Sequence, residues 1–203
     1  QIAWQVVDGT NTNLRTTVNI SKQDITNGKN LPGAKLEIRD TDGNLVEGWT
    51  STKTPHTVRG LELEKAYTLT ETRAPDGYAE AENIVFKLVQ EGNEQSNIVY
   101  VKSNDAWVKL DDVTVIMQDA PVLDIDKTDI AGNLLPGATL TIRDAGGEVI
   151  DTWVTDYKTH SVPISDDSLK LSDDSKEYIY TLTEDAAPAG FEIANSVQFK
   201  LGT

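Results

Sequence analysis

Three ionisable side chains stand where the sequence pattern predicts a core-facing residue. Lys22, Glu71 and Asp119 each continue a run of apolar residues spaced two apart, and residues two apart in a β-strand share one face. A charged side chain on a buried face is costly unless it is paired, protonated or chemically active. The sequence therefore predicts that these side chains partner one another. The apolar residues that set the three faces are Val18 and Ile20, Tyr67 and Leu69, and Val113, Val115 and Met117.

An amine and two carboxyl groups in an apolar interior can form an amide. Burial favours the neutral forms, so that the Lys22 amine becomes a nucleophile and the Asp119 carboxylic acid an electrophile. Glu71 would hydrogen-bond to the Asp119 carbonyl, polarise it and relay protons, while folding supplies proximity. The alternative is a buried ion triad, or charged side chains that reach water at strand ends. We expect a Lys22–Asp119 cross-link with Glu71 as its catalyst.

The pattern around Glu71 occurs twice in the chain. Residues 67–78 read YTLTETRAPDGY, and residues 180–191 repeat this skeleton as YTLTEDAAPAGF. Each copy predicts a strand followed by a Pro-x-Gly turn, and Lys127 and Glu184 take the places of Lys22 and Glu71. Such an internal repeat predicts two domains. Further matched landmarks are residues 31–34 with 135–138, 38–40 with 142–144, Trp49 with Trp153, and 86–88 with 199–201.

The short alternating runs predict an all-β fold. Turn signals separate these runs, and no window has helical periodicity. We expect two tandem immunoglobulin-like β-sandwich domains, residues 17–120 and 121–203, after an N-terminal strand and linker in residues 1–16. An extra hairpin is expected over residues 98–110, and an acidic insertion at residues 165–175 accounts for the longer spacing in the second domain.

Composition argues against several classes of function. The 203 residues carry a net charge of −15 with a pI near 4.4, which argues against nucleic-acid binding. There is no cysteine, so a covalent staple must use other chemistry. No run is long enough for a membrane span and no signal peptide opens the chain, which predicts a mature piece of a longer protein.

No cofactor and no metal are expected. Residues 40–44 read Asp-x-Asp-x-Asn, which invites interpretation as a calcium loop. Leu45 and Ser51, however, occupy the places where such a loop needs glycine and glutamate. We therefore reject a calcium site in this segment.

Both units resemble the collagen-adhesin B-type (CnaB, SpaA-type or prealbumin-like) domains of Gram-positive surface proteins. The resemblance rests on Lys22 in ISKQD, on LPGA and on the long YxLxExxAPxGY motif, and it covers residues 17–120 and 122–201. It implies a spontaneous isopeptide bond with Lys22 as nucleophile and Glu71 as catalytic acid. Most members use asparagine as the acceptor, whereas Asp119 looks like the acceptor of the branch seen in a streptococcal fibronectin-binding protein. Water would then be the leaving group.

The second unit lacks an acceptor in its own sequence. Lys127 and Glu184 are present, but no strand like residues 113–119 follows them. Residues 2–8 alternate in the same phase as residues 113–119 and also end on an acid, Asp8. Two explanations are open. Either the chain was cut from a longer tandem array, or Asp8 of one molecule completes the second unit of another and bonds to Lys127 in trans.

The resemblance implies a structural function outside the cell. Cross-linked tandem domains would form the stalk of a cell-wall-anchored adhesin or pilin on the bacterial surface, with neighbouring domains of the same protein as partners. The only reaction expected is the single-turnover cross-link. The chain has no LPxTG sorting motif and no pilin YPKN motif, so its anchoring and polymerisation are not predicted.

Two other functions have candidate residues. Trp107 has no counterpart in the second unit and is the candidate for binding a host ligand or glycan, whereas Trp49 and Trp153 are equivalent and are expected to pack. A hydrolase would use His56 or His160, but neither has a serine or cysteine nucleophile motif beside it. Ligand binding therefore stays as the alternative, and catalysis on an external substrate is not expected.

Overall fold

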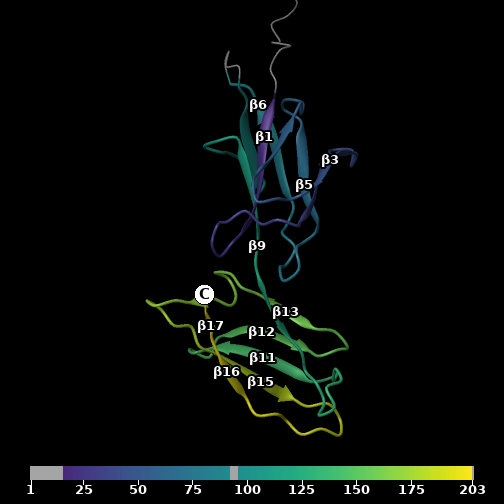
Figure 1. Cartoon of the computed structure of the whole chain (residues 1–203), viewed down its shortest axis with the longest axis vertical. Helices are drawn as coiled ribbons and strands as arrows, with labels where there is room; N and C mark the ends of the chain where they lie inside the picture. The colour runs from purple at the N-terminus through teal and green to yellow at the C-terminus, as the bar shows by residue number, and fades with distance from the viewer. Residues whose placement is uncertain (1–15, 92–95, 203) are drawn as a thin grey trace, which may run out of the picture. The chain divides into compact units, whose positions relative to one another are not determined.

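The computed structural model describes residues 16–91 and 96–202, and these residues form strands and loops without a helix. The predicted all-β fold is confirmed. The described chain divides into two compact units (Figure 1). Unit 1 is made by residues 16–24, 28–75 and 80–119, and unit 2 by residues 25–27, 76–79 and 120–202. Within the described ranges, no helix could cross a membrane.

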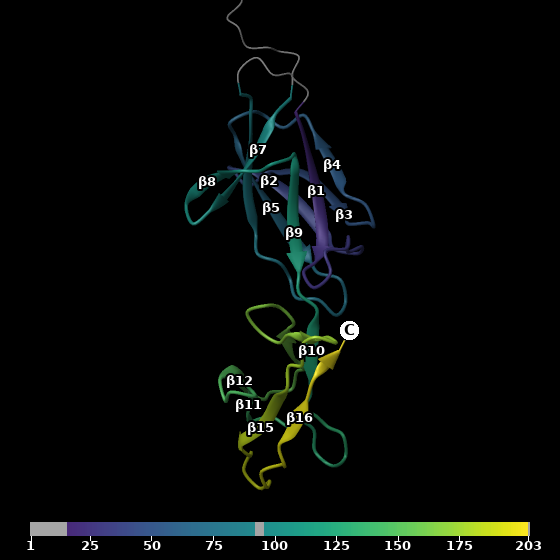
Figure 2. The same cartoon turned by 90° about the vertical axis from the view of Figure 1, so that its left-hand side faces the viewer.

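Unit 1 is a sandwich of two sheets. Strand β1 lies between β4, which is antiparallel to it, and β9, which is parallel to it (Figure 2). The second sheet has six strands in the order β3-β2-β5-β6-β7-β8. The bounds are β1 Thr17–Asp24, β2 Lys35–Asp40, β3 Leu45–Thr50, β4 His56–Arg59, β5 Ala66–Arg73, β6 Ile84–Val89, β7 Ile98–Ser103, β8 Ala106–Lys109 and β9 Thr114–Asp119. The predicted hairpin is confirmed as β7 and β8.

The core of unit 1 follows from the alternation along its strands. Val18 and Ile20 from β1, Leu69 from β5, Phe86 from β6 and Met117 from β9 are each at most 2% exposed and belong to one cluster. Residues between them point away from this core, because successive side chains of a strand face opposite sides. Burial of each large apolar side chain contributes about 1.5–3 kcal/mol.

Unit 2 repeats this plan with fewer strands. Strand β10 (Val122–Ile125) pairs with β13 (His160–Pro163), and β12 (Val149–Val154), β11 (Thr139–Asp144), β15 (Tyr180–Ala186) and β16 (Val197–Phe199) form a four-stranded sheet (Figure 1). A short parallel pair joins β14 (Leu171–Ser172) to β17 (Leu201–Gly202). Among the described residues, unit 2 contains no strand in the place that β9 has in unit 1.

The two repeated turn motifs meet in each unit. Gly33 of the Leu-Pro-Gly-Ala turn has φ +100°, and a Cβ built there would lie 3.8 Å from the Pro75 side chain of the Ala-Pro-x-Gly turn. Gly137 has φ +90°, and its Cβ would lie 3.7 Å from the Pro188 side chain. Glycine adopts this backbone conformation without strain. The repeat is therefore a repeat of one packing arrangement.

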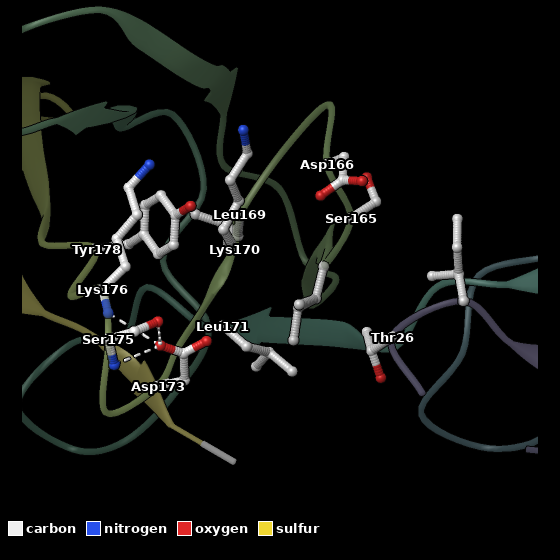
Figure 3. Close-up of a pocket in the computed structure, with 12 residues that line it drawn as sticks. Thr26, Ser165, Asp166, Leu169, Lys170, Leu171, Asp173, Ser175, Lys176 and Tyr178 are labelled. Carbon is white, nitrogen blue, oxygen red and sulfur yellow. Dashed lines mark hydrogen bonds between the residues drawn. The ribbon is translucent and has the colours of Figure 1, made fainter. Parts of the chain in front are cut away.

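The acidic insertion of unit 2 is an ordered loop. Asp173 Oδ1 accepts hydrogen bonds from the backbone N–H groups of Ser175 and Lys176, at 2.8 and 2.9 Å (Figure 3). The Ser175 hydroxyl also donates to Oδ1, and this bond, together with the two backbone bonds, lowers the pKa of Asp173. The Tyr178 ring, which follows the loop, lies near two lysine ammonium groups, with Lys176 Nζ 4.7 Å and Lys170 Nζ 5.9 Å from its centre. The insertion is therefore fixed by its own polar side chains.

Candidate functional site

Lys22, Glu71 and Asp119 meet between the two sheets of unit 1. Lys22 lies on β1, Asp119 ends β9 and Glu71 lies on β5 of the facing sheet, and their exposed fractions are 2%, 1% and 5%. Lys22 Nζ donates a hydrogen bond to Asp119 Oδ1 and lies 3.1 Å from Glu71 Oε1. The three residues selected from alternation are thus brought together in a buried interior.

The parallel register of β1 and β9 sets the amine against the acid. Lys22 stands opposite Met117, and Asp119 lies two residues further along β9 on the same face. The extended Lys22 side chain can therefore reach along the strand to the Asp119 carboxyl group. A shift of one residue would turn the Asp119 side chain to the outer face.

A β-bulge and a backbone donor position Glu71. Leu36 pairs with Glu71 while Lys35 pairs with Arg73, so Thr72 is the additional residue of a bulge beside the site. The backbone N–H of Ala81 donates a hydrogen bond of 2.8 Å to Glu71 Oε2. The other oxygen, Oε1, faces Lys22. No sequence signal predicted the role of Ala81, because every residue except proline carries the same backbone donor.

Burial controls the protonation of the acceptor. Desolvation raises the pKa of Asp119 from 3.8 to about 7, against the lowering effect of Lys22, and the adjacent Glu71 adds to the rise. Asp119 Oδ2 and Glu71 Oε1 are buried and accept no hydrogen bond from the described residues. The site therefore favours a protonated acid beside an amine more strongly than water does. Such an arrangement can support amide condensation.

His56 and His160 form a second repeated cluster. His56 stacks on Trp49 with ring centres 4.4 Å apart, and His56 Nε2 lies 2.6 Å from Glu47 Oε1. The pair links β4 of one sheet to β3 of the other, beside a pocket that is also lined by Lys22. Trp49 packs against the core, as expected. The corresponding unit 2 contacts are Trp153 with His160 at 4.1 Å and His160 with Asp151 at 2.7 Å.

Unit 2 holds two of the three groups. Lys127 Nζ donates a hydrogen bond of 3.0 Å to Glu184 Oε2, which also accepts one from the Ala194 N–H at 2.6 Å. Glu184 Oε1 is buried without a hydrogen-bond partner in the described part of the chain. The residue predicted as a trans acceptor, Asp8, lies outside the described residues. The structure thus places Lys127 and Glu184 together and leaves Asp8 undescribed.

The remaining candidates lie on the surface. The Trp107 side chain on β8 is 38% exposed, and Lys87 Nζ lies 5.1 Å from the centre of its ring. Asp40, from the rejected calcium segment, accepts hydrogen bonds from the side-chain amide of Asn44 and from the backbone N–H groups of Asn44 and Asp42, and these bonds lower its pKa. Among the described residues, no cluster of histidine, aspartate or glutamate could hold a metal ion.

One family model matches most of the chain. The model described as "SpaA: Prealbumin-like fold domain" matches residues 16–104 and 122–203. No curated protein matches the chain.

Solved structures that match the chain include a Bacillus anthracis protein and two pilus proteins. The Bacillus anthracis TIE protein is 24% identical, and the match covers 93% of this chain but 32% of that chain, with a TM-score of 0.38. The shaft pilin SpaA from Lactobacillus rhamnosus GG is 14% identical over 93% of each chain, with a TM-score of 0.34. The pilus adhesin SpaC from the same organism is 13% identical over 91% of this chain and 26% of that chain, with a TM-score of 0.31.

Proposed function

The chain belongs to the family of SpaA prealbumin-like fold domains, with two such domains in tandem, and from this premise we propose that it is a self-cross-linking stalk segment of a bacterial surface adhesin or pilin. Unit 1 would form an intramolecular amide cross-link between Lys22 and Asp119. The observation that carries this proposal is the buried contact of Lys22 Nζ with Asp119 Oδ1, with Glu71 Oε1 3.1 Å from the same amine.

The reaction is a condensation that the three side chains complete among themselves. The neutral Lys22 amine attacks Cγ of the protonated Asp119 carboxyl group. Glu71 accepts a proton from the attacking nitrogen and passes a proton to the departing hydroxyl, which leaves as water. One N–H bond and one C–O bond break, one C–N bond and one O–H bond of the departing water form, and Glu71 returns to its starting state. The buried site supplies the proximity that an activated ester or cofactor supplies elsewhere.

The bond would change how the unit bears load. It connects positions 97 residues apart, and by the chain-entropy relation used for disulfides such a closure stabilises by about 4–5 kcal/mol. Tension applied through β1 and β9 would pass through the amide. The residues between Lys22 and Asp119 would therefore bear no load. A stalk that holds a binding domain away from the cell wall requires this resistance to unfolding under tension.

Peptide mapping tests the bond. Trypsin does not cleave after an acylated lysine, so the wild type should yield residues 16–29 joined to residues 110–127, with the mass of the two peptides minus one water. Lys22→Ala should release them separately, whereas Lys53→Ala, which changes an exposed lysine of the same unit, should keep the joined product. Separate, unmodified peptides from the wild type would refute the cross-link.

Ligand binding is a second candidate function, favoured by the exposure of Trp107 on a hairpin for which unit 2 has no counterpart among the described residues. Aromatic rings at the surface commonly serve as contacts for a partner. A glycan array that compares the wild type with Trp107→Ala tests it. Binding lost in the variant supports the function, and no binding by the wild type counts against it.

A further inference from the structure

A cavity lies beside Lys22 where strand β4 begins. β4 pairs with β1 only as far as Ile20, which stands opposite His56, and Lys22 lies two residues further along β1 on the same face. The cavity has a volume of about 180 Å³, and Lys22, Trp49 and His56 are among the residues that line it. A cavity of this size can hold water molecules. It is therefore a route by which solvent can approach the Lys22 side chain.

The stacked rings of Trp49 and His56 form the outer wall of this cavity. Trp49 stands opposite Leu36, and Leu36 stands opposite Glu71, so these three side chains share one face of the six-stranded sheet. His56 comes from the facing sheet, and its ring lies 4.4 Å from the Trp49 ring with the two planes inclined by 17°. The His56 side chain is 33% exposed, whereas that of Lys22 is 1% exposed. The rings therefore lie on the solvent side of the cavity and the lysine on its buried side.

Polar contacts hold the two rings in place. His56 Nε2 lies 2.6 Å from Glu47 Oε1, so the histidine ring is tied to β3 at its edge as well as stacked on Trp49. Ser51, two residues after Trp49, accepts a hydrogen bond of 2.9 Å from the Ala34 N–H and is buried. This bond anchors the end of β3 to the neighbouring turn. The stack is therefore fixed from β3 and from the loop that follows it.

Unit 2 repeats the stack but not the loop that carries it. Asp151, Trp153 and His160 have the spacing of the corresponding acid, tryptophan and histidine of unit 1. Their rings lie 4.1 Å apart, and His160 Nε2 lies 2.7 Å from Asp151 Oδ2. The residues between tryptophan and histidine differ at every position, since residues 50–55 read TSTKTP and residues 154–159 read VTDYKT. The stack therefore accompanies the lysine–glutamate pair of each unit independently of the loop sequence.

We propose that the Trp49–His56 stack is a positioning element for the cross-link, which closes the cavity beside Lys22 and keeps bulk water away from its amine. Water competes with the attack on Asp119, because it hydrogen-bonds to the amine and favours the charged form. A closed site removes this competition and strengthens the polar contacts inside it. The proposal rests on the proposed function for the reaction and adds the residues that set its rate.

Chemical labelling tests the closure without depending on the cross-link. In the Asp119→Ala chain no acceptor remains, so the Lys22 amine is free whether or not the wild type forms the bond. The folded chain is treated with acetic anhydride, and peptide masses give the acetylation rate of Lys22 relative to the exposed Lys53. Adding His56→Ala should raise this ratio at least about tenfold, because the cavity opens to solvent. Adding His56→Phe, which keeps a flat ring against Trp49, should leave the ratio near its starting value.

Two further variants separate closure from a general loosening of the fold. Val58→Ala removes a core side chain that is 1% exposed on the same strand as His56 but lies outside the cavity lining. His160→Ala makes the histidine change in unit 2. Both should leave the relative labelling of Lys22 near its starting value. An unchanged ratio in His56→Ala would overturn the proposal, and so would an equal rise in Val58→Ala.

The rate of cross-linking tests the consequence of closure. Chains that retain Asp119 are made in a short pulse of cell-free synthesis and quenched in acid at intervals, and denaturing mass spectrometry gives the fraction short of one water. His56→Ala should slow the loss of water at least about tenfold, and His56→Phe should restore the wild-type rate. Equal rates in His56→Ala and the wild type would overturn the proposal. A wild type that keeps its full mass would instead refute the cross-link itself, and the labelling would then report the closure alone.

Discussion

Opposing influences act on the pKa of Asp119 and make the site reactive. Burial and Glu71 raise its pKa and Lys22 lowers it, so that the pKa is about 7 instead of 3.8. An exposed aspartate beside a lysine would be ionised and unreactive toward the amine. The same residue types at the surface, such as Lys102 and Asp105 at 3.0 Å, form an ordinary ion pair. Burial is what distinguishes the Lys22–Asp119 site from this surface ion pair.

The raised pKa predicts a pH dependence once the amine is removed. In Lys22→Ala no bond can form and the lowering effect of Lys22 is lost. The folded-state pKa of Asp119 then stays above the unfolded value of 3.8, and such a carboxyl group stabilises the fold fully below pH 3.8 and progressively less as the pH rises toward that folded-state pKa. We expect the free energy of unfolding of this variant, measured with denaturant, to fall across this interval.

The double variant Lys22→Ala/Asp119→Ala is the control for that experiment, because it retains every other titrating group. The decline from pH 3.8 to about 7 should be smaller in the double variant. Equal slopes in the two proteins would show that Asp119 has an ordinary pKa in the fold.

At the scale of elements, the two faces of β9 differ in burial. Met117 points into the core and is 1% exposed, while its neighbour Ile116 is 49% exposed. Met117→Ala should lower the free energy of unfolding by about 2–5 kcal/mol, because it leaves a cavity next to Lys22. Ile116→Ala, the matched control on the same strand, should change it by about 0.5 kcal/mol or less. Denaturant unfolding checks both, and similar losses would contradict the assigned faces.

Local alternation was sufficient to predict which side chains enter the core. Lys22, Glu71 and Asp119 were selected by period two alone, because the face of a strand residue depends on its immediate neighbours. The sandwich class and the β7–β8 hairpin followed from the spacing of strands and turns. The contact between Lys22 and Asp119 itself depends on the parallel pairing of β1 with β9, which is a long-range property.

Other features had no local signal. Strands β4 and β13 are four residues long and were not predicted, since such short runs become strands only by pairing with β1 and β10. Strand β5 begins at Ala66, and Glu64 just before it has φ 60°, a left-handed conformation that interrupts a strand. The stacking of His56 on Trp49 joins two sheets and could not be read from either residue alone.

At the scale of the whole molecule, the two units are compared by the groups that their described residues bring together. Unit 1 joins an amine, a catalytic acid and an acceptor, and the described part of unit 2 joins an amine and an acid. We expect unit 1 to resist force, because the amide would join its first and last strands covalently.

Single-molecule stretching measures this resistance. When the chain is pulled from its ends, wild-type unit 1 should not release the 97-residue loop. Glu71→Gln should add an unfolding step of roughly 300 Å, the extended length of the freed loop. A step of that size in the wild type would contradict the cross-link. It would show that hydrogen bonds between strands, and not an amide, carry the load.

Intact mass under denaturing conditions tests the central claim most directly. The wild-type monomer should weigh one water less than its sequence, because one carboxyl oxygen leaves when Lys22 and Asp119 join. Glu71→Gln should restore its full sequence mass, whereas Glu184→Gln, the same change in unit 2, should keep the deficit of one water. A wild-type monomer at its full sequence mass would contradict the account.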